Sequence, residues 1–208
     1  MQTKQTIIFD VFLSHDSADY ALVNRVWQIL TRMKIKAYMY ERYPQYGQYL
    51  PETIKQMLKA SKYVVVFWTR DGVTSQWVNQ EVGIAIGVAP EFQSIVIPVQ
   101  EMGVKVKGFT DPLLHIDYDP YNPDWMILSL IYELRKRLGM DKGSLTIDCD
   151  CGHRFESTLP TFDLVNETIE RGDKLSCTCT KCQRVVWVSP YTLEVTLCEG
   201  PPAPWWRT

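Results

Sequence analysis

The first two thirds of the chain alternate short apolar runs with stretches of helical periodicity. From Leu22 to Leu30, for example, apolar residues recur three and four positions apart, which predicts an amphipathic helix. Runs of β-branched and aromatic residues predict five strands, at 9–13, 35–40, 63–69, 94–99 and 113–116. Strands that alternate with helices favour right-handed crossovers, so we expect an α/β fold with a flavodoxin-like, doubly wound sheet of five parallel strands.

The segment 63–69 is the most strand-like of the five. Three consecutive valines, Val64 to Val66, suit a strand covered on both faces, so we expect it to lie at the centre of the sheet. Ligands of such sheets bind beyond the carboxyl ends of the strands, which here are followed by the loops 14–17, 41–49 and 70–81. None of these strands is followed by a glycine-rich phosphate-binding motif.

The cysteines predict a second domain. All six lie in the last third of the chain, where strand-like runs replace the strand and helix alternation. A helix beginning at Asp124 is expected to end near Gly139, which places the boundary just beyond it. We therefore expect a domain over 1–142 and a small, β-rich domain over 143–208 that ends in a Pro- and Trp-rich tail.

Composition excludes several classes of protein. The 208 residues are 46 % hydrophobic and 22 % charged, which is typical of a globular protein. Because 22 Lys and Arg are matched by 24 Asp and Glu, no basic field favours nucleic acid as a partner. No apolar stretch reaches the roughly 20 residues of a membrane span, and no signal peptide is apparent, so we expect a cytoplasmic protein with no membrane association.

Two cysteine pairs indicate a metal site in the second domain. Cys149 and Cys151, together with Cys179 and Cys182, suit a tetrahedral Zn²⁺ bound by four thiolates, as in a zinc ribbon. The spacing leaves the last ligand open, because Cys177 is an alternative to Cys179 and His153 a more remote one. Disulfide bonds are the competing interpretation, which a cytoplasmic protein disfavours.

This zinc is expected to be structural. A unit of this size has little core of its own, and no open coordination position with a neighbouring acid or base is evident. Its charged residues number 6 Lys and Arg against 9 Asp and Glu. That balance favours contact with an unidentified protein partner, self-association or the sensing of a trigger over nucleic acid.

Two motifs carry a resemblance to a known family. The run from Phe9 to His15, Phe-Asp-Val-Phe-Leu-Ser-His, resembles the first conserved box of Toll/interleukin-1 receptor (TIR) domains. The run from Ser75 to Glu81 is similar to the Ser-x-Trp-x-x-x-Glu element that marks the NAD-cleaving members of that family. The resemblance covers roughly residues 5–140, and it is loosest in the loop after the second strand.

The resemblance implies that Glu81 is catalytic and that Trp77 contacts the substrate. Residues four apart share one face of a helix, so the indole and the carboxylate can line one pocket. NAD⁺ cleavage releases neutral nicotinamide from a ribose with oxocarbenium character, and a single fixed carboxylate can stabilise that charge. For an arbitrary Trp and Glu at this spacing, packing and a solvated surface would be the default interpretation.

Other residues of the same edge are candidates for substrate binding. Ser14 and His15 end the first strand, where polar groups can meet a ribose or a phosphate, although His15 also suits a capping or surface role. Phe12 lies beside them and is also a candidate core residue. Tyr43 and Tyr46 could stack on a base or cover the pocket, or equally form a contact with another subunit.

Two function classes follow from the sequence. The leading hypothesis is an NAD⁺ glycohydrolase that yields nicotinamide with ADP-ribose or a cyclic ADP-ribose species and is activated by self-association, as the resemblance implies. The alternative is a TIR scaffold that acts only through TIR–TIR contacts. A third hypothesis is an N-glycosidase for a nucleoside or nucleotide other than NAD⁺, since the same carboxylate chemistry would serve.

Overall fold

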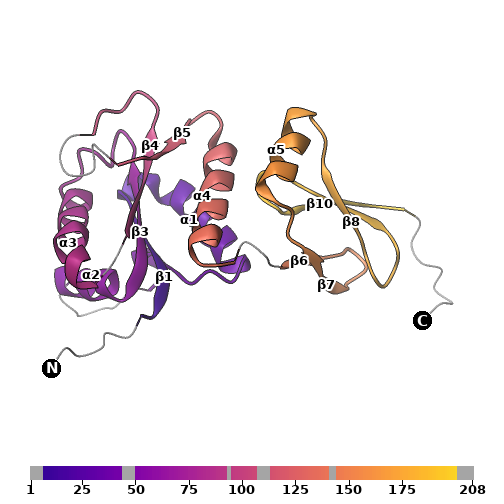
Figure 1. Cartoon of the computed structure of the whole chain (residues 1–208), viewed down its shortest axis with the longest axis horizontal. Coiled ribbons are helices and arrows are strands. Elements are labelled where there is room, and N and C mark those ends of the chain that lie inside the picture. Colours follow the sequence, from indigo (N-terminus) through magenta and orange to yellow (C-terminus); the bar gives the residue numbers. More distant parts are fainter. Residues whose placement is uncertain (1–6, 44–49, 93–94, 107–112, 141–143, 201–208) are drawn as a thin grey trace. The chain divides into compact units, whose positions relative to one another are not determined.

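The computed structural model describes residues 7–43, 50–92, 95–106, 113–140 and 144–200. The chain divides into two compact units, Met1–Met126 and Ile127–Thr208. Helix α4 (Pro123–Arg137) runs across this division, so it begins in the first unit and continues in the second (Figure 1). The domain boundary after residue 142 stays a prediction. Among the described residues, no helix is long and apolar enough to cross a membrane.

The first unit is a parallel sheet covered by helices. Its elements are β1 (Phe9–Ser14), the 3₁₀ turn η1 (Ser17–Asp19), α1 (Tyr20–Arg32), β2 (Ala37–Tyr38), the 3₁₀ turn η2 (Tyr40–Arg42), α2 (Leu50–Lys59), β3 (Ser61–Trp68), α3 (Gln76–Phe92), β4 (Ile95–Glu101) and β5 (Ile116–Tyr118). The strand order β2-β1-β3-β4-β5, with every pair parallel, confirms the flavodoxin-like prediction and the central position of β3. In this order, β2 lies on one side of β1 and β3 to β5 lie on the other. The topological switch point is thus between β1 and β3, which is where such folds bind ligands.

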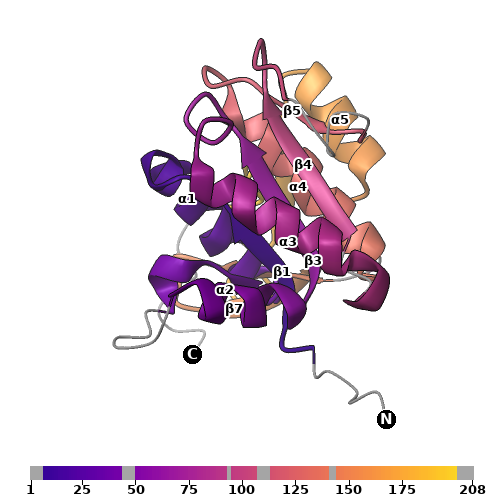
Figure 2. The same cartoon turned by 90° about the vertical axis from the view of Figure 1, so that its left-hand side faces the viewer.

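The helices cover both faces of this sheet. Figure 2 looks onto the face that carries α2 and α3, and α1 lies on the opposite face (Figures 1 and 2). Side chains alternate along β1, so Phe12 and Ser14 point to the α2 and α3 face while Val11 and Leu13 point to the other. The apolar cluster on the α3 side joins Phe12 to Val64 and Val66 of β3 and to Val78 and Val82 of α3. Ser14 thus ends its strand at the rim of this core.

The edges of the sheet differ from the prediction. The run 35–40 forms only the two-residue strand β2, because just Ala37 and Tyr38 pair with β1. The fifth strand is not 113–116 but Ile116–Tyr118, set by its pairing with Val99–Glu101 of β4, and Leu114 is 98 % exposed. Helix α3 continues past Gly87 to Phe92. Edge strands are short and are defined by pairing with a single neighbour, so apolar patterning places them poorly.

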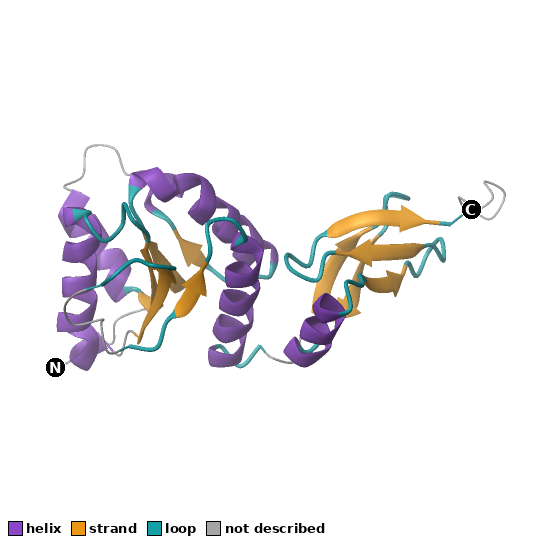
Figure 3. Cartoon of the chain, turned by 90° about the horizontal axis from the view of Figure 1, so that it is seen from above, coloured by secondary structure: helices purple, strands orange, loops and turns teal. Residues whose placement is uncertain are grey.

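Beyond α4, the second unit is mostly strands, as Figure 3 shows. A two-stranded sheet pairs β6 (Ser144–Asp148) with β7 (Arg154–Thr158), and a three-stranded antiparallel sheet has the order β10 (Val195–Glu199), β9 (Val185–Val188), β8 (Leu175–Thr178). The prediction that this part holds only strand-like runs was wrong in one respect. Helix α5 (Phe162–Glu170) lies between β7 and β8, with the Thr161 hydroxyl accepting a hydrogen bond from the backbone N–H of Leu164.

Candidate functional site

A pocket lies at the carboxyl ends of β1 and β2, beside the first turns of α3. Its cavity of about 270 Å³ is lined from β1 and the following turn by Phe12, Leu13, His15, Asp16 and Ser17, from the segment after β2 by Tyr40 and Glu41, and from the segment after β3 by Ser75, Trp77 and Glu81. The pocket is therefore at the topological switch point of the sheet, between β1 and β3, where the fold is expected to bind a ligand.

Helix α3 places Glu81 in this pocket. Val78, Val82 and Ala85 are buried against the sheet, and Glu81 lies on the same helical stripe, three residues after Val78. The Glu81 residue is accordingly only 5 % exposed. The stripe that anchors the helix thus carries a carboxylate into the apolar rim of the sheet.

A tight turn fixes where α3 begins. A side chain at Gly72 would bring a Cβ atom within 2.3 Å of the backbone oxygen of Phe67, at the end of β3. The backbone N–H of Gly72 donates to the Thr69 hydroxyl over 2.9 Å. Only glycine fits this close approach, so the turn sets the position from which Ser75, Trp77 and Glu81 project.

Ser14 holds the Glu81 carboxylate. Its hydroxyl donates a hydrogen bond to Oε2 of Glu81, which joins the end of β1 to α3 across 67 residues of sequence. Burial raises the pKa of Glu81 to about 7, although hydrogen bonds from Ser14 and Trp77 lower it. A carboxyl group in this range exists in both charge states near neutral pH, which is typical of functional sites.

His15 and Glu41 form a second polar pair in the pocket. His15 Nε2 lies 3.4 Å from Oε1 of Glu41, while Nδ1 lies 3.2 Å from the backbone oxygen of Leu13. Burial alone would lower the pKa of His15, but Glu41, the Leu13 carbonyl and the charge of Glu81 together outweigh it, and the pKa is raised. Conversely, His15 holds the pKa of Glu41 below its usual value despite partial burial. The pocket therefore contains an ion pair beside the buried Glu81.

The structure brings together five of the predicted substrate and catalytic residues: Phe12, His15, Trp77 and Glu81 line the pocket, and Ser14 binds Glu81. Tyr43 instead packs its ring on Tyr38 and Phe9, with ring centroids 5.4 Å apart in both contacts, and is not among the described lining residues. The predicted contact of Tyr46 lies outside the described residues.

Sequence reasoning placed the loop 41–49 at the ligand edge of the sheet but singled out neither Tyr40 nor Glu41 as a pocket residue. Within that loop it named only tyrosines as substrate contacts. A usable signal was present, because Glu41 closely follows a strand at the ligand edge of the sheet. What the sequence could not supply was the pairing of β2 with β1, which brings Glu41 to His15.

Comparison with known proteins now decides the family. A profile described as TIR domain matches residues 11–125, more than half of the chain. The chain belongs to the TIR domain family. A search of curated proteins finds no match.

Solved structures agree with this fold. The TIR domain of the Toll-related receptor TRR-2 from Hydra magnipapillata is 18 % identical, with a TM-score of 0.52 over 62 % of this chain and 99 % of that one. A TIR-STING receptor from C. gigas is 12 % identical, with a TM-score of 0.51 over 82 % of this chain and 78 % of that one. At these identities, the likeness concerns the fold of the TIR domain and not its chemistry.

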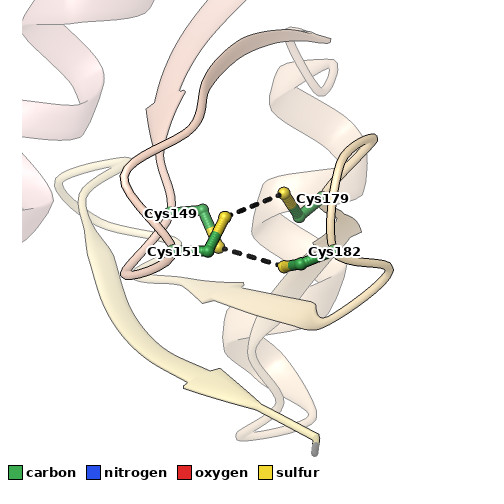
Figure 4. A group of neighbouring side chains, drawn as sticks. All are labelled: Cys149, Cys151, Cys179 and Cys182. Carbon is green, nitrogen blue, oxygen red and sulfur yellow. Dashed lines mark hydrogen bonds between the residues drawn. The ribbon is translucent and has the colours of Figure 1, made fainter. Parts of the chain in front are cut away.

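A separate cluster of four cysteines lies in the second unit. The Sγ atoms of Cys149, Cys151, Cys179 and Cys182 all lie within 4.8 Å of one another (Figure 4). Cys149 and Cys182 are 3.7 Å apart, and Cys151 and Cys179 are 3.8 Å apart. Sulfur atoms at the corners of a tetrahedron, about 2.3 Å from a central Zn²⁺, would be separated by about 3.8 Å. The cluster thus has the spacing of a four-thiolate zinc site.

The turns that carry these cysteines are short and closed by backbone hydrogen bonds. The N–H of Cys149 donates to the oxygen of His153, and the N–H of Gln183 donates to that of Cys179. Burial would raise the pKa of Cys179, but backbone N–H groups of Cys182 and Lys181 lower it. Burial raises the pKa of Cys149 and of Cys182. None of the six cysteines forms a disulfide.

The alternative ligands lie elsewhere. Cys177 belongs to β8, with Sγ 3.9 Å from the backbone oxygen of Val186, and His153 Nε2 is 3.0 Å from the Thr180 hydroxyl. The structure therefore gathers Cys179 and not Cys177 into the group, which we call the cysteine cluster.

Proposed function

We propose that this protein is an NAD⁺ glycohydrolase that cleaves the bond between nicotinamide and ribose. The observation that carries the proposal is Glu81, a buried carboxylate that lines a pocket at the ligand edge of a TIR fold and is held by Ser14. Burying a carboxylate costs free energy, since the charged form loses its hydration. A domain that acts only by surface contacts has no need of that cost.

The pocket suits the reacting end of NAD⁺. A cavity of about 270 Å³ is small for a whole dinucleotide but adequate for the nicotinamide and its ribose. The apolar walls formed by Phe12 and Trp77 suit the planar pyridinium ring, and carboxylates at Glu41 and Glu81 favour its positive charge. The diphosphate and the adenosine would then extend out of this cavity.

Glu81 supplies the chemistry. As the glycosidic bond breaks, positive charge develops on the ribose, and the ionised carboxylate stabilises it across a water-poor pocket. Nicotinamide leaves as a neutral molecule, so no acid is needed to protonate it. Water, or a nucleophile of the ADP-ribose itself, then captures the ribosyl cation to give the linear or the cyclic product.

The direct test is nicotinamide release by Glu81→Gln and by the wild type. We expect the variant to lose at least about a hundredfold in kcat, since it lacks the charge that the transition state requires. Glu52→Gln, which changes an exposed carboxylate of α2 in the same unit, is the matched control and should keep full activity. Equal rates for the wild type and Glu81→Gln would refute the assignment of Glu81.

The pH profile provides a second test. Because burial raises the pKa of Glu81 to about 7, kcat/KM should rise with pH through this value as the carboxylate ionises. The Ser14 hydroxyl lowers that pKa, so Ser14→Ala should move the midpoint to higher pH. A profile that is flat between pH 5 and pH 9 would contradict the proposed role.

Two other functions remain candidates. A TIR scaffold would show self-association without nicotinamide release at any protein concentration. An N-glycosidase for another nucleotide would cleave that nucleotide in preference to NAD⁺, which a panel of nucleosides and nucleotides would reveal. The pocket favours an enzyme over a scaffold because Ser14 and Glu81 form a buried polar pair away from the exposed surface.

We further propose that activity depends on self-association through the TIR domain, and that the protein acts in the cytoplasm. Activity per molecule should then rise with protein concentration, whereas a constant value would contradict the dependence. The partner of the second unit stays unidentified.

For the cysteine cluster, we propose a structural zinc ion bound by all four thiolates. The sulfur spacing supports this ligand set, and residues 144–200 bury a smaller apolar core than the first unit does, so metal binding would add to their stability. Metal analysis of protein purified without chelator should find one zinc per chain. Cys182→Ser should lose it, while Cys177→Ser should not, because Cys177 lies outside the cluster.

A further inference from the structure

A fifth thiol lies beside the cysteine cluster. The Sγ atoms of Cys198 and Cys149 and a carboxylate oxygen of Asp150 are all within 4.8 Å of one another. Four thiolates already complete a tetrahedral zinc site, so Cys198 is not needed as a ligand. Its position next to a ligand calls for another explanation.

The strand that carries Cys198 is weakly held. β10 is at the edge of its sheet and pairs only with β9, its register shifts between Val195 and Leu197, and four of its five residues are exposed. Gly200 follows the strand directly, with a φ of 117°. An edge strand with an irregular register can shift at small cost, which would allow Cys198 to approach Cys149.

An ion pair links the turn of the partner thiol to the strand next to β10. Both carboxylate oxygens of Asp150, the residue after Cys149, accept hydrogen bonds of 2.8 Å from one guanidinium nitrogen of Arg184. Arg184 immediately precedes β9, the strand that pairs with β10. This ion pair keeps the turn of Cys149 next to the strand neighbour of Cys198.

We propose that Cys198 is an oxidation site that forms a disulfide bond with Cys149 and thereby releases the zinc. The proposal rests on the zinc site proposed above. The oxidant belongs to the class of hydroperoxides, which convert an accessible thiol to a sulfenic acid. Cys198 is partly exposed, whereas Cys149 is 5 % exposed, so Cys198 is the more accessible thiol of this pair.

The reaction balances with hydrogen peroxide as the oxidant. The Cys198 thiol takes one oxygen atom from the peroxide, is oxidised by two electrons and releases water. The Cys149 thiolate then leaves the zinc and attacks the sulfenic sulfur, forming the S–S bond and expelling hydroxide, which takes up one proton to give a second water. One peroxide is reduced, and one disulfide is formed.

The second unit gains a chemical trigger from this reaction. Loss of Cys149 leaves three thiolates, which bind zinc less tightly than four, so the metal would dissociate and the free energy of binding would be lost to the fold. Reduction of the disulfide by a dithiol in the presence of zinc should restore the site.

Cys177 provides a matched control. Cys177 of β8 and Cys198 of β10 both lie opposite Val186 of the middle strand, β9. The two thiols are therefore on the same face of the sheet, on its two outer strands. Like Cys198, Cys177 is partly exposed, but it does not belong to either group of neighbouring ligands. Cys177→Ser therefore removes a similar thiol without removing the proposed chemistry.

The experiment begins with the metal content of the full-length protein. One zinc per chain in the wild type, Cys198→Ser and Cys177→Ser establishes the site, and absence of zinc from the wild type would refute the zinc proposal itself. Hydrogen peroxide is then added, and zinc release is followed with a chromogenic chelator. We expect release from Cys198→Ser to be at least about fivefold slower than from the wild type, and release from Cys177→Ser to be unchanged.

Disulfide mapping tests the proposal without any variant. Trypsin should place Cys149 in the peptide 143–154 and Cys198 in the peptide 185–207. Fragmentation of the linked peptides from peroxide-treated wild type should locate the bond at Cys149 and not at Cys151. Equal release rates for the zinc-loaded wild type and Cys198→Ser, or disulfides formed only among the four ligands, would overturn the inference while leaving the zinc site intact.

Discussion

In the TIR domain, a sheet covered on both faces supplies a large apolar core, and its polar pocket lies at the edge of that core. In the second unit, the sheets have two and three strands, and four cysteines gather where the turns meet. The first unit buries the Glu81 carboxylate at the edge of this core, and we expect that burial to cost stability. Residues 144–200 of the second unit bury a smaller apolar core, so we expect the proposed zinc to contribute much of the stability of this part of the fold.

The largest expected difference between the two units is their response to removal of the metal. A strong zinc chelator at neutral pH should abolish amide protection over 144–200 while leaving that over 7–106 unchanged, because zinc binding contributes on the order of 10 kcal/mol to the fold of small metal-binding units. Hydrogen exchange with mass spectrometry, by segment, measures this. Retained protection over 144–200 without zinc would show that the second unit has a sufficient core of its own.

A second prediction concerns the cost of the buried carboxylate. The pKa of Glu81 is raised from 4.5 to about 7 in the folded state, so the folded protein binds more protons than the unfolded one between these values and loses stability as the pH rises. Glu81→Gln should therefore be more stable than the wild type by on the order of 3 kcal/mol at pH 8, and no more stable at pH 4.

Urea denaturation at both pH values measures the difference. Glu52→Gln serves again as the control, because its carboxylate is exposed and should give no such pH-dependent gain. If Glu81→Gln were no more stable than the wild type at pH 8, burial of the Glu81 carboxylate would not lower the free energy of unfolding.

A third, smaller effect should separate two glycines of the first unit. At Gly72, an added Cβ would meet the Phe67 oxygen at 2.3 Å, so Gly72→Ala must displace the backbone and should cost about 1 to 3 kcal/mol. It should also lower activity, because the turn positions α3. Gly83 lies exposed within α3 and has nothing within 4 Å of the added atom, so Gly83→Ala should instead gain up to about 1 kcal/mol.

Thermal unfolding and nicotinamide release on the same samples provide the two readouts. A Gly72→Ala variant with wild-type stability would mean that the turn adapts and does not fix the helix.

The smallest predicted effect belongs to the His15 and Glu41 pair. Its stabilisation requires a charged Glu41, which is lost as the pH falls below about 4.5, and a charged His15, whose pKa is raised from 6.5 and whose charge is lost as the pH rises through that raised value. Glu41→Gln should thus cost less than about 1 kcal/mol, and only between these limits. Glu167→Gln breaks an exposed ion pair with Arg171, which stays charged at neutral pH. The loss of stability in this variant should therefore not disappear as the pH rises past neutrality.

The denaturation midpoint, measured every half pH unit from 4 to 9, tests the window. A constant difference between Glu41→Gln and the wild type at all pH values would exclude a role for His15 ionisation.

The parts predicted well from sequence were those that depend on local pattern and dense burial. The valines of β3 predicted a central strand, and the spacing of Trp77 and Glu81 predicted that both residues share one face of a helix. The edges were predicted poorly, since β2 and β5 are defined by pairing with a neighbour. Helix α5 was missed although Phe162, Val165 and Ile169 recur at helical spacing and Thr161 caps the helix, so the sequence did carry a signal for it.

The sequence by itself determined the strand and helix order of the TIR domain, the chemistry available at Glu81 and the presence of two cysteine pairs, since each depends on residue type and near spacing. Only the tertiary structure decided which groups meet. The packing of α3 on the sheet brought Ser14 to Glu81, and the pairing of β1 with β2 brought His15 to Glu41. The fold of the second unit left Cys177 outside the cluster and placed Cys198 beside Cys149. Contacts between residues far apart in sequence depend on sheet register, which no local pattern encodes.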